Sequence, residues 1–255
     1  MTYLKYLMAA RLSFTEHLAA NPWRITVTAL WPRALLQCLF WVLIGRVSGA
    51  GARFAFPGAL ALIITLSTVI GVSDVPMLDR RSGTYYRVRM ARVSIAGLYA
   101  ARCAPWIADA VVTFLLCVAL VGPAAGVGSM SLDLLRCLPV YLVMILSSTA
   151  AGLAVASLGT RFNSNVLLGN SLAYLMLAAG SLIVSAGRVP FLRWVGDVLP
   201  MTHGVAAVRA FADGRPWAGQ LGWELLVGLG WAAAAALSYT VQAARVRRTG
   251  NEFGI

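Results

Sequence analysis

Six long apolar runs constrain the fold of this chain more than any other feature of its sequence. They lie approximately at 25–44, 57–78, 103–121, 137–158, 166–186 and 221–243. A helix needs about 20 predominantly apolar residues to cross the hydrocarbon core of a bilayer, and only 12% of the residues are charged. We therefore predict one transmembrane domain over residues 1–255, an all-α integral membrane protein with six transmembrane helices.

Two segments outside these runs are predicted to form short helices. Apolar and basic residues are interspersed over residues 1–24, as at Leu4 and Lys5, which favours an amphipathic helix on the cytoplasmic membrane surface over a solvated tail. The link 187–220 between the fifth and sixth runs is semi-apolar, which fits short re-entrant helices buried in protein. The other external links, 45–56 and 122–136, are short and rich in glycine.

Five arginines lie between the second and third runs, in the segment 79–92. Basic residues near the ends of spans are retained on the cytoplasmic side. With both termini in the cytoplasm, 12 of the 21 lysines and arginines are cytoplasmic and seven are external. We therefore expect a multi-pass protein whose termini and 79–92 segment face the cytoplasm.

The formal net charge of +12 does not indicate a nucleic-acid-binding protein, because most of the excess lies in short segments beside the apolar runs. Anionic lipid headgroups are the expected partners there, and no nucleic acid is expected. The four cysteines lie in or at the ends of the runs without the paired spacing of metal ligands, so no metal site is expected.

The common catalytic motifs are missing from the chain. Lys5 is the only lysine, so the sequence cannot supply the lysine that a P-loop places on nucleotide phosphates. There is no HExxH or GxSxG motif, and the histidines are His17 and His203 alone. We expect no catalytic or cofactor-binding residues, so ATP-driven work would need a second protein.

Two acidic residues lie in apolar surroundings, where carboxylates are costly and face a cavity or a partner. Asp109 lies inside the third run, and Glu224 lies near the external start of the sixth. Each is a candidate for the substrate path; Asp109 would there favour a cationic amphiphile. The alternatives are pairing of Asp109 with Arg102 or a hydroxyl group, and of Glu224 with an external arginine; we favour the pairings.

Several motifs together resemble the membrane subunit of ABC-2 type exporters. Phe56-Pro57-Gly58 opens the second run, and Arg81-Ser82-Gly83-Thr84 follows it. The most specific match precedes the last run and consists of Pro200, Thr202, His203 and Arg209. It is similar to the Pro-hydrophobic-Thr-His and Ala-hydrophobic-Arg signature of family members that export drugs and glycolipid-like molecules.

The resemblance implies that two copies of the chain face each other in the inner membrane of a bacterium, with two copies of a cognate ABC ATPase on the cytoplasmic side. ATP and Mg would bind to that ATPase. Residues 79–92 would be the coupling segment, which contacts the ATPase through Asp79, Arg80, Arg81, Gly83, Thr84, Tyr85, Arg87 and Arg89. Family members commonly have an acidic residue where this chain has Ser82.

The resemblance also implies a cargo. It favours efflux of a hydrophobic or amphipathic drug, antibiotic or lipid-like molecule, and hence a role in antibiotic resistance. A permease for polysaccharide or glycolipid export is the main alternative. An intramembrane enzyme and a non-catalytic assembly factor are less favoured, because the apolar runs show no convergent set of ionisable residues.

Overall fold

The computed structural model describes residues 2–83, 93–162, 164–183 and 190–249. Helices occupy most of these ranges, and no strand occurs in them. The helices are α1 (Thr2–Ala20), α2 (Trp23–Ile25), the π-helical turn η1 (Thr26–Leu30), α3 (Trp31–Val47), α4 (Ala52–Arg81), α6 (Ile95–Arg102), α7 (Ala104–Ala124), α8 (Gly128–Arg136), α9 (Leu138–Phe162), α10 (Asn165–Ala179), α11 (Pro190–Asp197), α12 (Thr202–Ala212) and α13 (Ala218–Thr249). The predicted all-α fold is confirmed.

Five helical stretches in the described chain are long and apolar enough to cross a membrane. They are Trp23–Val47, Ala52–Arg81, Ile95–Ala124, Leu138–Gly159 and Ala218–Arg245, and they match five of the six predicted runs. The run at 166–186 begins with the shorter apolar helix α10. A multi-pass membrane fold is therefore confirmed, and the sixth span stays a prediction.

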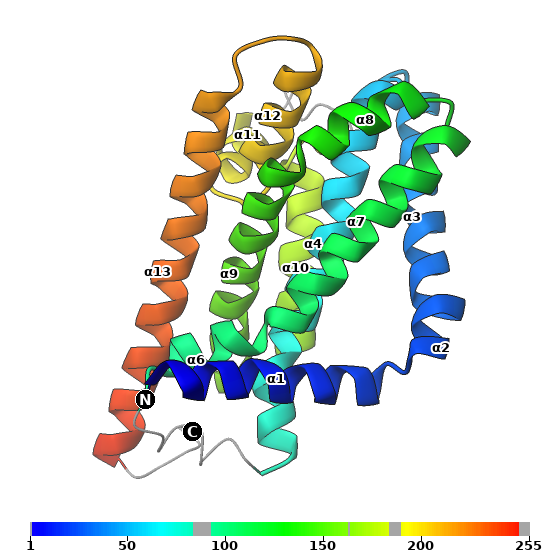
Figure 1. Cartoon of the computed structure of the whole chain (residues 1–255). Helices are drawn as coiled ribbons and strands as arrows, with labels where there is room; N and C mark the ends of the chain where they lie inside the picture. Colours follow the sequence, from blue (N-terminus) through cyan, green and yellow to red (C-terminus); the bar gives the residue numbers. More distant parts are fainter. Residues whose placement is uncertain (1, 84–92, 163, 184–189, 250–255) are drawn as a thin grey trace.

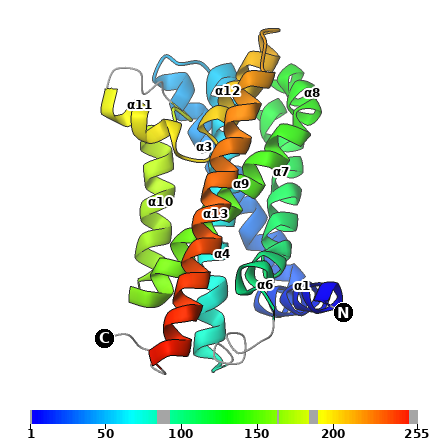
Figure 2. The ribbon, with the colours of Figure 1, turned by 90° about the vertical axis from the view of Figure 1, so that its left-hand side faces the viewer.

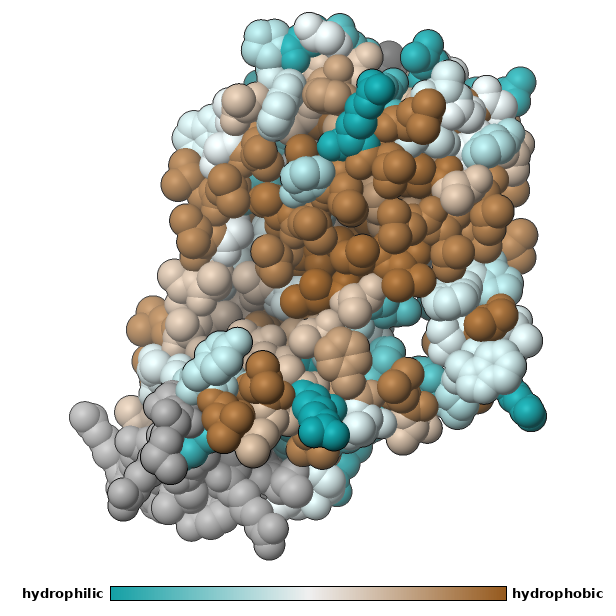
Figure 3. Space-filling model, viewed as in Figure 1, coloured by the Kyte–Doolittle hydropathy of each residue, from teal (hydrophilic) through white to brown (hydrophobic). Residues whose placement is uncertain are grey.

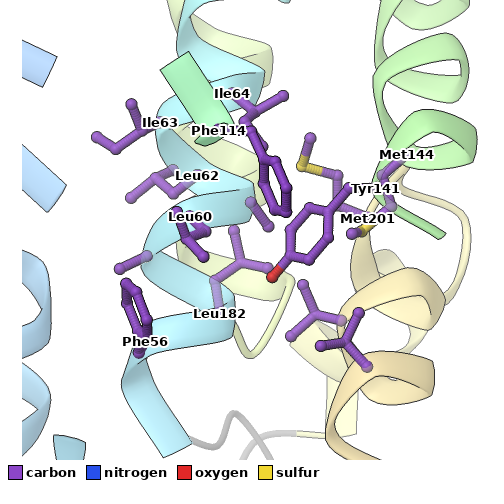
Figure 4. Close-up of a cluster of buried hydrophobic side chains, with 14 of the residues drawn as sticks. Phe56, Leu60, Leu62, Ile63, Ile64, Phe114, Tyr141, Met144, Leu182 and Met201 are labelled. Carbon is purple, nitrogen blue, oxygen red and sulfur yellow. The ribbon is translucent and has the colours of Figure 1, made fainter. Parts of the chain in front are cut away.

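Helix α4 lies at the centre of the bundle and carries much of its core. Helices α3, α7, α9 and α10 pack around it, and most of its side chains are buried. Figure 4 shows Phe56 and Leu60 of α4 in the same cluster as Phe114 of α7 and Tyr141 of α9. The Tyr141 hydroxyl donates a hydrogen bond of 3.1 Å to the carbonyl oxygen of Pro57, so this core also fixes the position of the α4 backbone.

The short helices cover the two ends of the bundle. Helix α1 lies across one end, roughly perpendicular to the long helices, and α8, α11 and α12 lie at the opposite end (Figure 1). The predicted N-terminal helix and the predicted short helices within 187–220 are thus present. Helix α8 was not predicted, because residues 122–136 read only as a glycine-rich link.

The surface follows the same division into two ends and a middle. Apolar side chains cover the middle of the face drawn in Figure 3, and hydrophilic side chains gather toward its ends. Helix α13 runs the length of the bundle, so its C-terminal end lies at the same end as α1 (Figure 2). The two ends of the described chain are therefore on one side of the apolar band.

Candidate functional site

A group of three charged side chains, two of them buried, joins α1, α4 and α6 at the α1 end of the bundle. We call Glu16, Asp79 and Arg102 the ion triad. One Arg102 nitrogen donates to a carboxylate oxygen of Asp79, and the other terminal nitrogen donates to Glu16 over 2.6 Å. The Arg102 and Asp79 side chains are 7% and 5% exposed, while that of Glu16 is 46% exposed. Arg102 thus faces one acid inside the protein and one at its surface.

The ion triad links the two helices, α4 and α6, between which the predicted coupling segment runs. Asp79 lies near the C-terminal end of α4, and Arg102 is the last residue of α6, so residues 84–92 connect two elements that the ion pair holds together. The Ser13 hydroxyl of α1 adds a hydrogen bond of 2.7 Å to the Arg102 carbonyl oxygen. Helix α1 is therefore fastened to α6 through its side chains at two successive turns.

Of the coupling residues named from the sequence, four lie in the described part of the chain and four lie outside it. Asp79 is buried in the ion triad, whereas Arg81 is exposed. Arg80 is half-buried, and Gly83 is exposed with a φ of +70°, a left-handed conformation that glycine adopts without strain. The others lie outside the described residues: Thr84, Tyr85, Arg87 and Arg89. Their contacts with an ATPase stay predictions.

At the opposite end, the Glu224 carboxylate of α13 caps the N-terminus of α12. It accepts hydrogen bonds from the backbone N–H groups of Met201 and Gly204, at 2.9 and 3.0 Å. Glu224 is fully buried. The free N–H groups and the positive end of the helix dipole together stabilise a carboxylate at such a place. The partner of Glu224 is thus the α12 backbone, where the sequence favoured an arginine.

Arg209 of α12 binds the backbone in the first turn of α4 and just after the end of α10. Its guanidinium group donates to the Phe54 carbonyl at 3.0 and 3.2 Å, to Ser181 at 2.9 Å and to Leu182 at 2.7 Å. The Cζ atom of Arg209 lies 3.6 Å from the centroid of the Phe54 ring. Burial lowers the pKa of Arg209 to about 10, so the group remains charged at neutral pH. It holds the segment after α10 against the start of α4.

The contact between these two segments leaves no room for a side chain at position 58 of α4. A Cβ atom added to Gly58 would lie 1.6 Å from the carbonyl oxygen of Leu182. Leu182 also accepts a hydrogen bond from Arg209. The Phe-Pro-Gly motif and the arginine of the sequence signature therefore meet at one packing contact, 151 residues apart in the chain.

A comparison with family models matches the chain to the model described as ABC-2 type transporter, over residues 16–211. The chain belongs to the ABC-2 type transporter family. No curated protein and no solved structure matches the chain. The ABC-2 match begins at Glu16 of the ion triad and ends two residues after Arg209. The ion triad and Arg209 therefore lie within the matched residues, and Glu224 lies outside them. The chain is accordingly a permease subunit of an ABC transporter, the transmembrane component rather than the ATPase.

In this ABC-2 permease, the histidine of the signature bridges three elements. The His203 Nε2 atom lies 3.0 Å from the Asp197 carbonyl at the end of α11, and Nδ1 lies 3.2 Å from Oε1 of Gln220 in α13. Pro200 is buried just before α12, and Thr202 begins that helix. Pro200, Thr202, His203 and Arg209 therefore lie together in the packing of α11 and α12.

Asp109 of the permease is not paired with Arg102. Arg102 is occupied by the ion triad, and the Asp109 carboxylate instead lies next to the Trp31 indole and the His17 imidazole. The favoured pairing of Asp109 with Arg102 is thus wrong. Within the described ranges, Asp109 forms no salt bridge.

Little in the sequence indicates the ion triad. Glu16 lies in the predicted amphipathic helix of residues 1–24, and Arg102 was considered only as a partner of Asp109. Their pairing joins residues 86 positions apart, which no local periodicity encodes. The one available signal was an arginine at the edge of a span, since a buried charge requires a partner.

Proposed function

We propose that this chain is the permease of an ATP-driven exporter. Two copies form the translocation path, and a separate ABC ATPase that binds ATP and Mg docks on the residues 79–92. The proposal places both termini in the cytoplasm and the protein in the inner membrane of a bacterium. The cargo is a hydrophobic or amphipathic small molecule, as the sequence signature favours.

The observation that carries the proposal is the direct path from the coupling segment to the core. Helix α4 runs unbroken from Ala52 to Arg81, and Asp79 near its end is held to α6 by Arg102. A force on residues 84–92 therefore acts on the most central helix of the bundle and on α6 together. This arrangement supports a role of that segment in receiving a movement from outside the chain.

The distribution of arginines supports the orientation. The α1 end of the bundle carries Arg80 and Arg81 together with the basic residues of α1, and α13 ends there as well. Helices α8, α11 and α12, with fewer arginines, lie at the opposite end. The positive-inside rule places the more basic end in the cytoplasm, where an ATPase has access to ATP.

Co-purification with the cognate ATPase tests the proposal. In the variant Arg87→Glu/Arg89→Glu, the ATPase should no longer co-purify, because guanidinium groups that pair with carboxylates are replaced by like charges. A charge-matched control is Arg136→Glu/Arg193→Glu, whose arginines lie in α8 and α11 at the opposite end. This control should retain the ATPase. Unchanged co-purification of the first variant would refute docking at this segment.

The copy number needs a separate measurement. Helices α3 and α13 present large exposed apolar side chains, including Leu36, Leu229 and Leu237, which face lipid or a second copy. Native mass spectrometry of the permease with its ATPase should give two copies of each chain. A complex with a single permease copy would contradict the proposed dimeric path.

A further inference from the structure

We infer that Asp109 and Trp31 form a binding site for a lipophilic organic cation, an ammonium or phosphonium group on an apolar body. The inference deepens the proposed function and rests on it, since it names the class of cargo. It concerns the region where α1, α3 and α7 meet. In Figure 3 the surface is hollowed there, beside α1.

The carboxylate of Asp109 supplies the charge of this site. It is half-buried on α7, near the end of the bundle that α1 covers. No basic side chain of the described residues forms a salt bridge with it. An unpaired carboxylate in apolar surroundings is costly, and a cationic ligand would remove that cost by providing the missing counter-charge.

Aromatic side chains flank the carboxylate. Trp31 of α3 lies within side-chain hydrogen-bonding reach of it, and the Trp31 indole N–H has no other partner among the described residues. Trp106 precedes Asp109 by three residues and so lies on the same side of α7. The electron-rich faces of tryptophan rings attract organic cations, so the chemistry of both neighbours fits the same ligand class.

The helix geometry before Trp31 is irregular in a way that points to this site. The N–H of Trp31 bonds to the carbonyl of Thr26, five residues back, so the helix widens into the π turn Thr26–Leu30. Pro32 follows and has no N–H to donate. Such π turns are frequent at functional sites. The extra residue in the turn changes the helix face on which Trp31 lies, which brings its ring to α7.

The remaining neighbours leave the negative charge of Asp109 uncompensated. His17 of α1 packs edge-on against Trp106, with ring centroids 4.5 Å apart and an interplanar angle of 82°. Burial lowers the pKa of His17, which favours its neutral form at neutral pH. Arg102 is occupied by Glu16 and Asp79. Asp109 therefore has no salt-bridge partner among the described residues.

The membrane side of the site is apolar. Val112 lies one turn after Asp109 on α7 and is exposed, as is Val27 in the π turn of the first span. A ligand that approaches from the lipid would therefore pass apolar side chains before its charge reaches Asp109. This arrangement suits a cation carried on a hydrophobic body and disfavours a small hydrated ion.

Two probes of matched shape and opposite charge test the inference. Tetraphenylphosphonium is the cationic probe and tetraphenylborate the anionic one, each measured by equilibrium binding to the purified chain in phosphatidylcholine nanodiscs, with empty nanodiscs as blank. The wild-type chain should bind the phosphonium saturably and should not bind the borate saturably. The variant Asp109→Asn should weaken phosphonium binding by at least about tenfold, because it removes the charge that attracts the cation.

Further variants separate the aromatic contribution from folding. Trp31→Phe retains an aromatic face and should stay within about threefold of wild type, while Trp31→Ala should lose about tenfold. Asp133→Asn, an acid on α8 at the opposite end of the bundle, is the matched control and should bind as wild type does. Size-exclusion profiles and helical circular dichroism identify a variant that fails to fold.

Three outcomes would overturn the inference: phosphonium binding unchanged in Asp109→Asn, no saturable binding of the phosphonium by the wild type, or equal saturable binding of the borate. The assay contains no ATPase. Its failure would therefore leave the co-purification test of the proposed function intact, and a failure of co-purification would leave the binding result intact.

Discussion

The Arg102 side chain binds Asp79 at a depth where both groups are almost completely shielded, with 7% and 5% of their side chains exposed. Each has lost most of its hydration, so each depends on the other. Because these residues lie on the two helices that flank residues 84–92, the stability of this pair decides how firmly the two helices move together.

Replacing Arg102 with Met should destabilise the protein by about 3–5 kcal/mol, because the buried Asp79 carboxylate loses its ion pair with Arg102. The double variant Arg102→Met/Asp79→Asn should recover part of that loss. Thermal unfolding of the purified chain in detergent measures both effects. The control is Arg136→Met, which removes an exposed pair with Asp133 and should cost less than about 1 kcal/mol. Equal losses at Arg102 and Arg136 would contradict the buried pair.

Replacing Glu224 with Ala should free the first turn of α12. The substitution removes two hydrogen bonds to a charged acceptor, each worth about 1.5–3 kcal/mol, and Glu224→Gln should lose less because one acceptor oxygen remains. Hydrogen exchange at the amides of Met201 and Gly204 should accelerate in Glu224→Ala. Glu252→Ala, a second glutamate near the C-terminus of the sequence, is a composition-matched control. Unchanged exchange at both amides would show that Glu224 is not the cap.

Arg209→Lys should not preserve the function of the arginine. An ammonium group cannot reproduce the planar fork that reaches the carbonyls of Phe54, Ser181 and Leu182. We expect a loss of about 2–4 kcal/mol, because at least one buried carbonyl is left without a donor. The lysine variant should unfold at a temperature near that of Arg209→Met. A lysine variant as stable as the wild type would argue against the multiple bonds.

The packing of α1 should weaken at acid pH. Burial lowers the pKa of His17 from its usual 6.5, although the Asp109 carboxylate acts in the opposite direction. The unfolded chain therefore binds a proton more readily than the folded chain, and stability falls as the pH drops through 6.5. The difference in melting temperature between pH 7.5 and pH 5.5 should be smaller in His17→Gln than in the wild type. The same difference in both would show that His17 does not contribute.

Hydropathy predicted the spans well because a span is a local property of the sequence. Five of the predicted runs coincide with helices, and the short helices α11 and α12 appear within the link where the semi-apolar pattern placed them. Helix α8 was not predicted, because Gly126 and Gly128, just before and at its start, indicated a turn. Glycine at such a place ends one helix as easily as it precedes the next.

The partners of the charged residues could not be predicted in the same way. Arg209 reaches Phe54 across 155 residues, and Arg102 reaches Glu16 across 86. Such pairs depend on which helices become neighbours, which no single run encodes. The sequence did mark Asp109 and Glu224 as unusual, because each is charged in apolar surroundings, and it marked Arg209 through the family signature. The choice among arginine, backbone and ligand as the partner nevertheless needed the packed structure.

The close contact between Gly58 and Leu182 is a point about which α4 could tilt. Gly71, farther along α4, presses on the ring of Trp106, because a Cβ atom there would lie 2.3 Å from that ring. If α4 tilts about Gly58, the constant rise per residue makes Gly71 travel about 0.6 of the distance that Asp79 travels. A push on the Asp79 end of α4 would thereby move the helix against Trp106, the ring that lies three residues before Asp109, in the same direction and over a shorter distance.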